Sequence, residues 1–360
     1  MVEAYIVSII AILLAYRARF ERYQKALPWA FVIITVFLSL GYNWGNDVPT
    51  YELWFWNFTE YKPFDFDSIV ILSDKSEYGY ILINQLCKPI GFWGMRAVLF
   101  AFENYVIYLL VKRTVPREYY WLALFVYTFN PYFMILSSSM MRQWLAMCIV
   151  ILGFLYLEKR RWIVYIALVL LASTIHRSSI ICLPLVVLPY LTYKFKKTHL
   201  LLIIPALAVY YVLSGYVVQY VVGWLMTEEM YTNYTDSMYS SGVGIMAILH
   251  LLIYVFMFAN ISQIEKEKRI YVAVLIIFGL VLPLYNYSGL ASRLGFYFTV
   301  FTICAYPIFF KQSQLDKSYK TVLTIAVIIV ILYSNILFYA DPMWYYYFGK
   351  YKTLFEAGIL

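Results

Sequence analysis

Charged residues are scarce in this sequence, where Asp, Glu, Lys and Arg together make up 13% of 360 residues and hydrophobic residues make up 63%. Soluble globular domains carry roughly a quarter charged residues, so the composition excludes an ordinary soluble domain. Apolar runs of about 17–25 residues recur, each long enough to cross a bilayer as a helix. They include 26–42, 92–111, 200–222, 243–260 and 321–338. The sequence therefore predicts an all-α polytopic integral membrane protein.

Cysteine and histidine are also rare, with four and three copies, and none shows the spacing of metal ligands. Phosphate-binding loops, dinucleotide fingerprints and HExxH or CxxC motifs are missing. The connections assigned below to the cytoplasm are too short for a nucleotide-binding domain. We therefore expect no metal, no cofactor and no nucleic-acid partner.

Most of the 28 basic residues gather in short connections that the positive-inside rule places in the cytoplasm. These connections lie around 17–25, 112–117, 159–161, 194–197, 266–269 and 311–320. About twelve crossings, with both termini outside, satisfy this pattern. The prediction is a single transmembrane domain over 1–360, with a long extracytoplasmic segment at 43–77 and a second outer loop at 224–242.

The segment YGYILINQLCKPIGF, residues 78–92, does not fit as a full span. Counting it as one would place the basic loops at 112–117 and 159–161 outside. We interpret 78–91 as a re-entrant or interfacial segment that enters from the outside, because non-helical backbone at that depth is tolerated where protein covers it.

Three arginines lie on the predicted outer side, each beside serines where a helix is expected to begin: Arg142, Arg177 and Arg293. Serine is a favoured N-cap, and a helix N-terminus with an arginine fork suits phosphate. Three such sites would suit a diphosphate at the outer surface. The alternative is that each arginine only extends toward lipid headgroups.

Candidate acid–base residues accompany the arginines. His176 precedes Arg177, Glu77 precedes the 78–91 segment, and Asp47 lies in the turn of GYNWGNDVPTYELWFWNF. A neutral imidazole or a carboxylate could accept a proton. His176 could equally be structural, and Glu77 could cap a helix. Trp54 and Trp56 lie in an aromatic-polar stretch that suits stacking on sugar rings, although an interfacial aromatic belt explains many such residues.

Several short motifs occur in an order that resembles the EpsG-like branch of bacterial Wzy-type polysaccharide polymerases. They are Asn43, Gly45, Asp47 and Tyr51; Glu77 and Gly79; Arg142 with Gln143; His176 and Ser178; and Arg293 in SRLGFYF. They are spread over about 40–300 of the chain. Arg177 stands between His176 and Ser178, where the family pattern gives no guide.

The resemblance implies a GT-C-like, metal-independent glycosyltransferase in the bacterial inner membrane, with its site facing outward. It would polymerise undecaprenyl-diphosphate-linked oligosaccharide units, which serve as donor and acceptor, for O-antigen, exopolysaccharide or capsule. A chain-length regulator and a flippase would be partners. In this scheme Arg142, Arg177 and Arg293 bind the diphosphate, and His176, Asp47 or Glu77 activates the acceptor. Tyr51, Trp54, Trp56 and Gln143 would contact sugar. A lipid-linked oligosaccharide flippase, an O-antigen ligase and a sugar O-acyltransferase remain alternatives.

Overall fold

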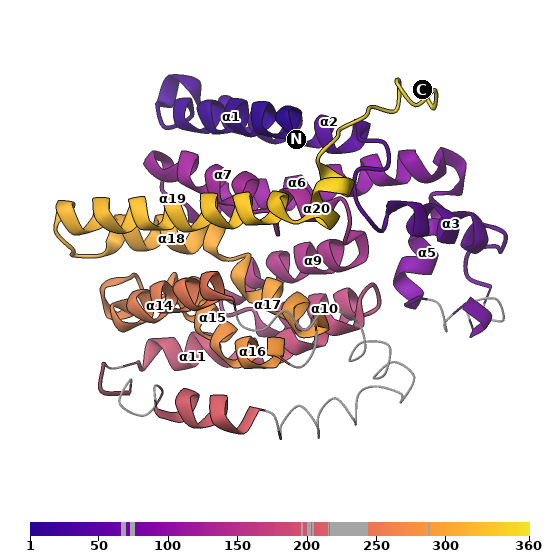
Figure 1. The fold of residues 1–360 in the computed structure, drawn as a ribbon. Coiled ribbons are helices and arrows are strands. Elements are labelled where there is room, and N and C mark those ends of the chain that lie inside the picture. Colours follow the sequence, from indigo (N-terminus) through magenta and orange to yellow (C-terminus); the bar gives the residue numbers. More distant parts are fainter. Residues whose placement is uncertain are drawn as a thin grey trace. The chain divides into compact units, whose positions relative to one another are not determined.

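The computed structural model describes residues 1–65, 70–72, 76–195, 197–199, 203, 205–214, 216, 244–286 and 289–360 (Figure 1). Its regular structure there is helical, apart from one isolated β-bridge between Gly41 and Thr353. The chain divides into two compact units. The first comprises Met1–Leu183 with Ile331–Leu360, and the second comprises Pro184–Val330.

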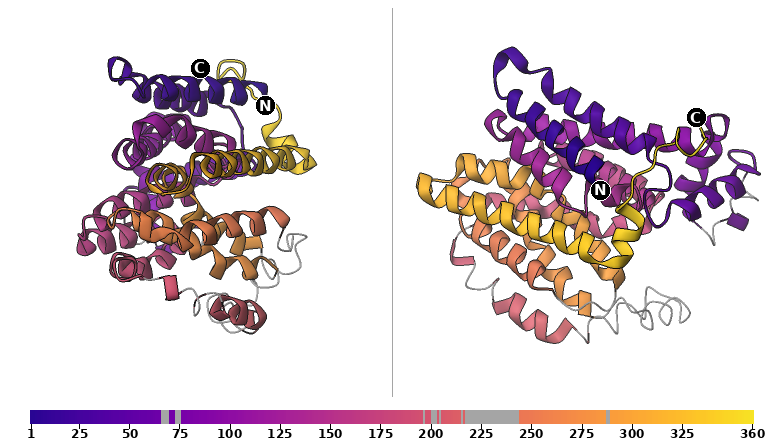
Figure 2. Two further views of the ribbon diagram at one scale, coloured as in Figure 1. Left: turned by 90° about the vertical axis from the view of Figure 1, so that its left-hand side faces the viewer. Right: turned by 45° about the horizontal axis from the view of Figure 1, so that its top comes forward.

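The first unit consists of long and short helices. Its helices are α1 (Val2–Arg17), α2 (Ala26–Leu40), α3 (Val48–Thr59), α5 (Tyr78–Leu86), α6 (Gly91–Thr114), α7 (Tyr120–Phe129), α8 (Met134–Ser137), α9 (Met141–Leu157), α10 (Trp162–Ser173), α20 (Pro342–Phe348) and the end of α19 (Lys317–Ala340). Short 3-10 turns lie at η1 (Glu21–Tyr23), η2 (Lys88–Ile90) and η3 (Arg117–Tyr119). Figure 2 shows α1 and α2, in indigo, side by side in both views. Further packing joins α1 to α7, α2 to α6, α6 to α9, and α9 to α10.

Helix α1 shows why these segments pack as they do. Its buried positions are small residues, including Ala4, Ser8, Ala11 and Ala15, whereas large apolar residues such as Leu13 are exposed. Small residues allow the backbones of neighbouring helices to approach closely, and outward-facing apolar side chains suit lipid. The pattern is that of a membrane helix.

The second unit is organised around α15. Its elements are the remainder of η4 (Arg177–Val187), then α11 (Leu188–Tyr193), η5 (Lys197–His199), α14 (Ile245–Ala259), η6 (Ile261–Gln263), α15 (Arg269–Ile276), α16 (Phe278–Val281), η7 (Leu282–Asn286), α17 (Gly289–Thr299), α18 (Thr302–Gln312) and most of α19. Helix α15 is almost entirely buried and contacts α11, α14, α17 and α18.

The all-helical prediction is confirmed for the described residues. Among them, four helical stretches are long and apolar enough to cross a membrane: Glu21–Leu40, Lys88–Thr114, Arg293–Gln312 and Lys317–Ala340. Shorter apolar helices accompany them. These apolar helices indicate a multi-pass membrane protein. The twelve crossings, their orientation and the single domain stay predictions, and the loop at 224–242 lies outside the described residues.

The structure adds detail to two segments. The residues after Arg177, where a helix was expected to begin, form the 3-10 helix η4 followed by the short α11. A continuous α-helix is interrupted there because Pro184 and Pro189 lack the N–H that it needs. The 78–91 segment is the nine-residue α5 followed by η2. At 1.5 Å per residue α5 is about 14 Å long, too short for a full span. The re-entrant or interfacial position of 78–91 stays a prediction.

Candidate active site

The carboxylate of Glu77 contacts three other predicted site residues in the first unit. Glu77 precedes α5, and its Oε2 accepts a hydrogen bond from Arg142 Nη1 at 2.7 Å. Its Oε1 accepts from the backbone N–H of Arg177 at 3.0 Å. The Nδ1 atom of His176 lies 3.4 Å from the same oxygen, an electrostatic contact without hydrogen-bond geometry. Three of the predicted site residues thus meet a fourth.

The local backbone explains how Glu77 reaches these partners. Helix α10 ends at Ser173, and the chain turns so that His176 and Arg177 follow directly. The N–H of Gly79 donates to the carbonyl of Thr174 at 2.7 Å. A Cβ atom on residue 79 would lie only 2.4 Å from Thr174 Oγ1 and 2.8 Å from its carbonyl oxygen. Glycine is therefore required for α5 to begin this close to the end of α10.

Aromatic rings enclose the Arg142 side chain. Its guanidinium carbon lies 4.9 Å from the ring centroid of Trp54, 5.9 Å from that of Tyr80 and 6.0 Å from that of Tyr51. Arg142 Nη1 also donates to Ser76 Oγ at 3.1 Å. The side chain is 19% exposed. Ion pairing and cation–π contacts together fix the guanidinium while leaving part of it accessible.

Glu77 is held in its charged form. Burial by itself raises the pKa of a carboxyl group, but the imidazole of His176, the charge of Arg142 and the N–H of Arg177 outweigh it and lower the pKa from 4.5 to about 2. A carboxylate with so low a pKa is a weak base near neutral pH. Glu77 is therefore suited to holding Arg142 and His176 in place, and poorly suited to accepting a proton.

Asp47 is linked to the segment that leads into α9. Its N–H donates to Ser139 Oγ at 3.3 Å, Ser139 Oγ donates to Asn46 Oδ1, and Asn46 Nδ2 donates to Asp47 Oδ1 at 2.8 Å. Gly45 has φ +140°, and a Cβ there would lie 3.2 Å from the backbone of Ser138. The turn thus needs glycine for its conformation and for its close approach.

The C-terminal residues fix the other side of this turn. Trp44 Nε1 donates to the Phe348 carbonyl at 3.1 Å, and the N–H of Tyr42 donates to the Lys352 carbonyl at 2.8 Å. Tyr351 stacks on Phe37 with ring centroids 4.4 Å apart. Residues 348–352 are therefore part of the scaffold that presents Asn46 and Asp47.

Arg96 is a residue that the sequence interpretation did not assign to the site. Its fully buried side chain lies in α6 and donates from Nη1 to the Gly41 carbonyl at 2.9 Å. Within the described part of the chain, Nε and Nη2 have no hydrogen-bond partner. The ring of Trp93 lies 4.9 Å from its guanidinium carbon, and buried Glu103 lies two helical turns further along the same face. A charged residue within an apolar helix is the sequence signal that could have identified Arg96 as a candidate functional residue.

The remaining predicted residues lie as follows. Gln143 is buried directly after Arg142, and the Arg177 side chain is exposed. Trp54 faces Arg142, whereas Trp56, two residues on along α3, is 54% exposed. Arg293 belongs to the second unit, in the second turn of α17, and is exposed.

The predicted serine caps are wrong for α9. This helix begins at Met141 after Met140, without a side-chain cap. Ser137 and Ser138 instead donate to carbonyls three residues earlier, and Ser139 donates to Asn46. Arg142 nevertheless lies in the first turn, as predicted, whereas Arg293 does not. Ser288, one of the serines predicted to cap the helix that contains Arg293, lies outside the described residues.

The arrangement combines a partly accessible guanidinium, an imidazole held by a carboxylate, and aromatic rings. It can bind an anion and move a proton. Among the described residues, no cluster of His, Cys, Asp and Glu is suited to hold a metal ion. The sequence model of the EpsG family matches residues 25–353. Neither a curated protein nor a solved structure matches the chain.

Proposed function

Because the chain belongs to the EpsG family, which is associated with exopolysaccharide biosynthesis, we propose that it is the membrane glycosyltransferase that polymerises lipid-linked oligosaccharide repeat units. The donor and acceptor are units carried on undecaprenyl diphosphate, and the reaction occurs at the extracytoplasmic face. Arg293, which belongs to the second unit, keeps its predicted diphosphate-binding role as part of this proposal. The GT-C-like character belongs to the same proposal.

The observation that carries the proposal is the contact of Arg142 with Glu77 at 2.7 Å, with His176 on the other carboxylate oxygen. When the acceptor hydroxyl attacks the anomeric carbon, the bond from that carbon to the diphosphate oxygen breaks. Negative charge develops on the leaving diphosphate, and a positioned guanidinium stabilises it. Arg142 has the fixed orientation and partial exposure that this role requires.

The proton of the acceptor hydroxyl passes to His176. With Nδ1 turned toward Glu77, a neutral ring carrying its proton on that nitrogen leaves Nε2 as the acceptor. In hydrolases a carboxylate that accepts a hydrogen bond from Nδ1 orients the catalytic imidazole. In this proposal the 3.4 Å contact tightens to such a hydrogen bond when substrate binds. Of the three candidate bases, His176 is therefore preferred. Glu77 is assigned to positioning, and Asp47 to the turn beside Ser139.

Aromatic side chains supply the sugar-binding surface. Trp54 and Tyr51 lie against Arg142, so a sugar stacked there would be next to the diphosphate. Exposed Trp56 lies on another face of α3 and is assigned to the lipid interface. Gln143, in the first turn of α9, keeps its sugar-binding role in this proposal. The flippase and the chain-length regulator remain proposed partners.

The decisive test supplies purified protein with a lipid-linked repeat unit and no nucleotide. A ladder of lengthening lipid-linked products supports the polymerase. Transfer of a single unit to a lipid A core acceptor without lengthening indicates a ligase. Movement of units across proteoliposomes without new glycosidic bonds indicates a flippase. Acyl transfer to the sugar from an added acyl donor indicates an acyltransferase.

A further inference from the structure

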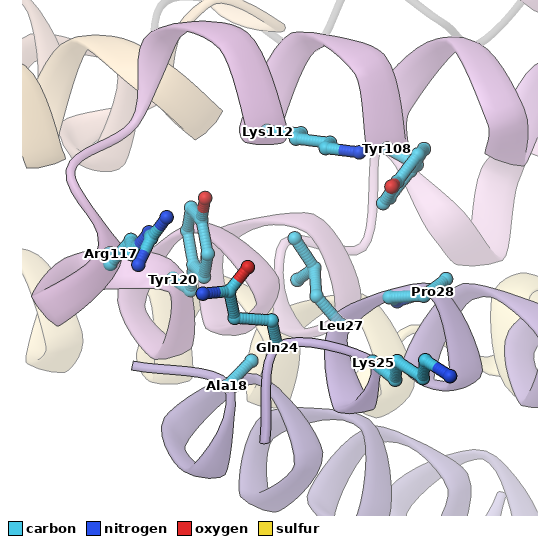
Figure 3. Close-up of a pocket in the computed structure, with 9 residues that line it drawn as sticks. All are labelled: Ala18, Gln24, Lys25, Leu27, Pro28, Tyr108, Lys112, Arg117 and Tyr120. Carbon is cyan, nitrogen blue, oxygen red and sulfur yellow. The ribbon is translucent and has the colours of Figure 1, made fainter. Parts of the chain in front are cut away.

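A second polar feature of the first unit lies away from Glu77. A cavity of about 340 Å³ opens where α1, α2, α6 and α7 begin or end (Figure 3). It is lined by Ala18, Gln24, Lys25, Leu27, Pro28, Tyr108, Lys112, Arg117 and Tyr120. Its volume lies within the range of about 300–1,000 Å³ that is usual for small-molecule sites.

The charges around this cavity are of one sign. Lys25, Lys112 and Arg117 line it, and none of the nine lining residues is acidic. Arg117 pairs with Glu21, which lies 3.4 Å from Arg117 Nη1 and is 87% exposed. An ion pair so exposed is weak and gives way readily to a stronger anion. The cavity is therefore an electropositive space without an internal counter-ion.

Neutral donors complete the lining. Tyr108 and Tyr120 bring phenol hydroxyls, and Gln24 brings an amide. Figure 3 shows Lys112 directed toward Tyr108, with its Nζ 5.3 Å from the ring centroid, while Lys25 extends away from Arg117. Cationic and hydroxyl donors together suit the oxygens of a phosphate group.

The cavity lies toward the C-terminal end of α6. Large aromatic side chains near it face outward, namely Phe20, Trp29 and Tyr105, which are 48%, 60% and 56% exposed. Such aromatics are enriched where helices meet headgroups. Along α6, Lys112 follows Arg96 by 16 residues, a separation of about 24 Å. Arg96 contacts the Gly41 turn, so the cavity and the candidate active site are at opposite ends of this helix.

We propose that this cavity is a phosphate-binding site, distinct from the catalytic centre, that takes a phosphomonoester or phosphodiester at the opposite membrane face. Lys112 and Arg117 form its charged core, with the two tyrosines as hydroxyl donors. An anionic phospholipid headgroup and a soluble phosphorylated molecule both carry a phosphate of this kind. Binding there ties the ends of four helices together.

The test measures binding to full-length protein in neutral detergent. The probes are short-chain phosphatidylglycerol, inorganic phosphate and short-chain phosphatidylcholine. The double variant Lys112→Gln, Arg117→Gln should weaken binding of an anionic probe at least tenfold, while Lys112→Arg, Arg117→Lys should retain it. The matched control Arg22→Gln removes a charge from the same region outside the cavity and should change binding less than twofold. Glu21→Gln should tighten binding, because it removes the competing carboxylate.

Each probe pattern has a defined meaning. Binding of phosphatidylglycerol alone assigns the cavity to a lipid headgroup, and binding of inorganic phosphate assigns it to a soluble ligand. Equal binding of phosphatidylcholine and phosphatidylglycerol would overturn the proposal, as would the absence of any anionic binding. A loss with Arg22→Gln as large as that of the double variant would also overturn it, because general surface charge would then explain the result. Far-ultraviolet circular dichroism and a single gel-filtration peak establish that each variant is folded.

Discussion

Two groups of basic side chains in the first unit differ in what faces them. Arg142 and the N–H of Arg177 converge on one carboxylate, Glu77, which is 12% exposed. Lys112 and Arg117 line a cavity without an acid, and Glu21 contacts Arg117 only from the exposed surface. A largely buried counter-ion fixes the geometry of a cation, whereas a cation without one stays available to a ligand.

The largest effect is expected where the carboxylate and the guanidinium are separated. Arg142→Lys retains the charge but loses the planar fork, and Glu77→Gln removes the counter-ion. Each should lower the rate of polymer elongation by about 10²–10³-fold, the usual effect of losing one preorganised electrostatic group. Initial rates with purified protein measure this. The matched control is Arg117→Lys at the cavity, which should retain the wild-type rate. Elongation by Arg142→Lys at the wild-type rate would contradict the assignment.

The next effect concerns the glycine that brings Glu77 to its partners. Gly79→Ala places a Cβ 2.4 Å from Thr174 Oγ1 and 3.0 Å from its carbonyl carbon, so α5 must move. Overpacking of this kind costs about 1–3 kcal/mol of unfolding free energy. Thermal unfolding in detergent measures it. Thr174→Ala should not rescue the variant, because the backbone clash remains. Gly244→Ala, whose Cβ would have nothing within 4 Å, is the control and should change stability by less than about 1 kcal/mol.

Low pH should remove the contribution of Glu77 to the free energy of unfolding. The pKa of Glu77 is lowered from 4.5 to about 2, so its contribution to stability is fully present above pH 4.5. It is lost as the pH falls from 4.5 toward 2. The wild-type protein should therefore lose more stability than Glu77→Gln over this interval. Urea unfolding at pH 5, 4 and 3 compares them, and parallel curves for the two proteins would be the opposing result.

The smallest effect is expected at the exposed pair beside the cavity. Arg117 and Glu21 side chains are 47% and 87% exposed, at a distance of 3.4 Å. Ion pairs in such positions contribute about 0–1 kcal/mol. Glu21→Gln should thus shift the unfolding free energy by no more than about 0.5 kcal/mol in buffer without phosphate. A larger loss would mean that Glu21 acts as an internal counter-ion after all, and the contrast with Glu77 would fail.

Composition and local pattern predicted the helical class and much of the site. Arg142 in the first turn of α9, Glu77 directly before α5, and the turn at His176 follow from residues that lie close together in the sequence. Lipid requires helices, so hydropathy alone is informative there. Local pattern therefore predicted where these residues of the candidate site lie in their helices and turns, but it did not predict their mutual contacts. Their roles stay predictions.

What the sequence could not supply depends on tertiary approach. Glu77 meets Arg142 across 65 residues and the Arg177 N–H across 100 residues, and no local rule predicts such pairs. The same holds for buried Arg96, which reaches the carbonyl of Gly41 across 55 residues. The predicted serine caps of α9 were wrong because the hydroxyls of Ser137 and Ser138 donate to carbonyls three residues earlier. Trp56 was assigned with Trp54, but residues two apart on a helix face different directions.

The most direct test of the account is a double-mutant cycle between Glu77 and Arg142. Elongation rates are measured for the wild type, Glu77→Gln, Arg142→Gln and the double variant, all in purified form with a lipid-linked repeat unit. If the two side chains act as one unit, the double variant will be no slower than the slower single variant. Rate losses that multiply in the double variant would show that the carboxylate and the guanidinium act independently, and would contradict the positioning role of Glu77.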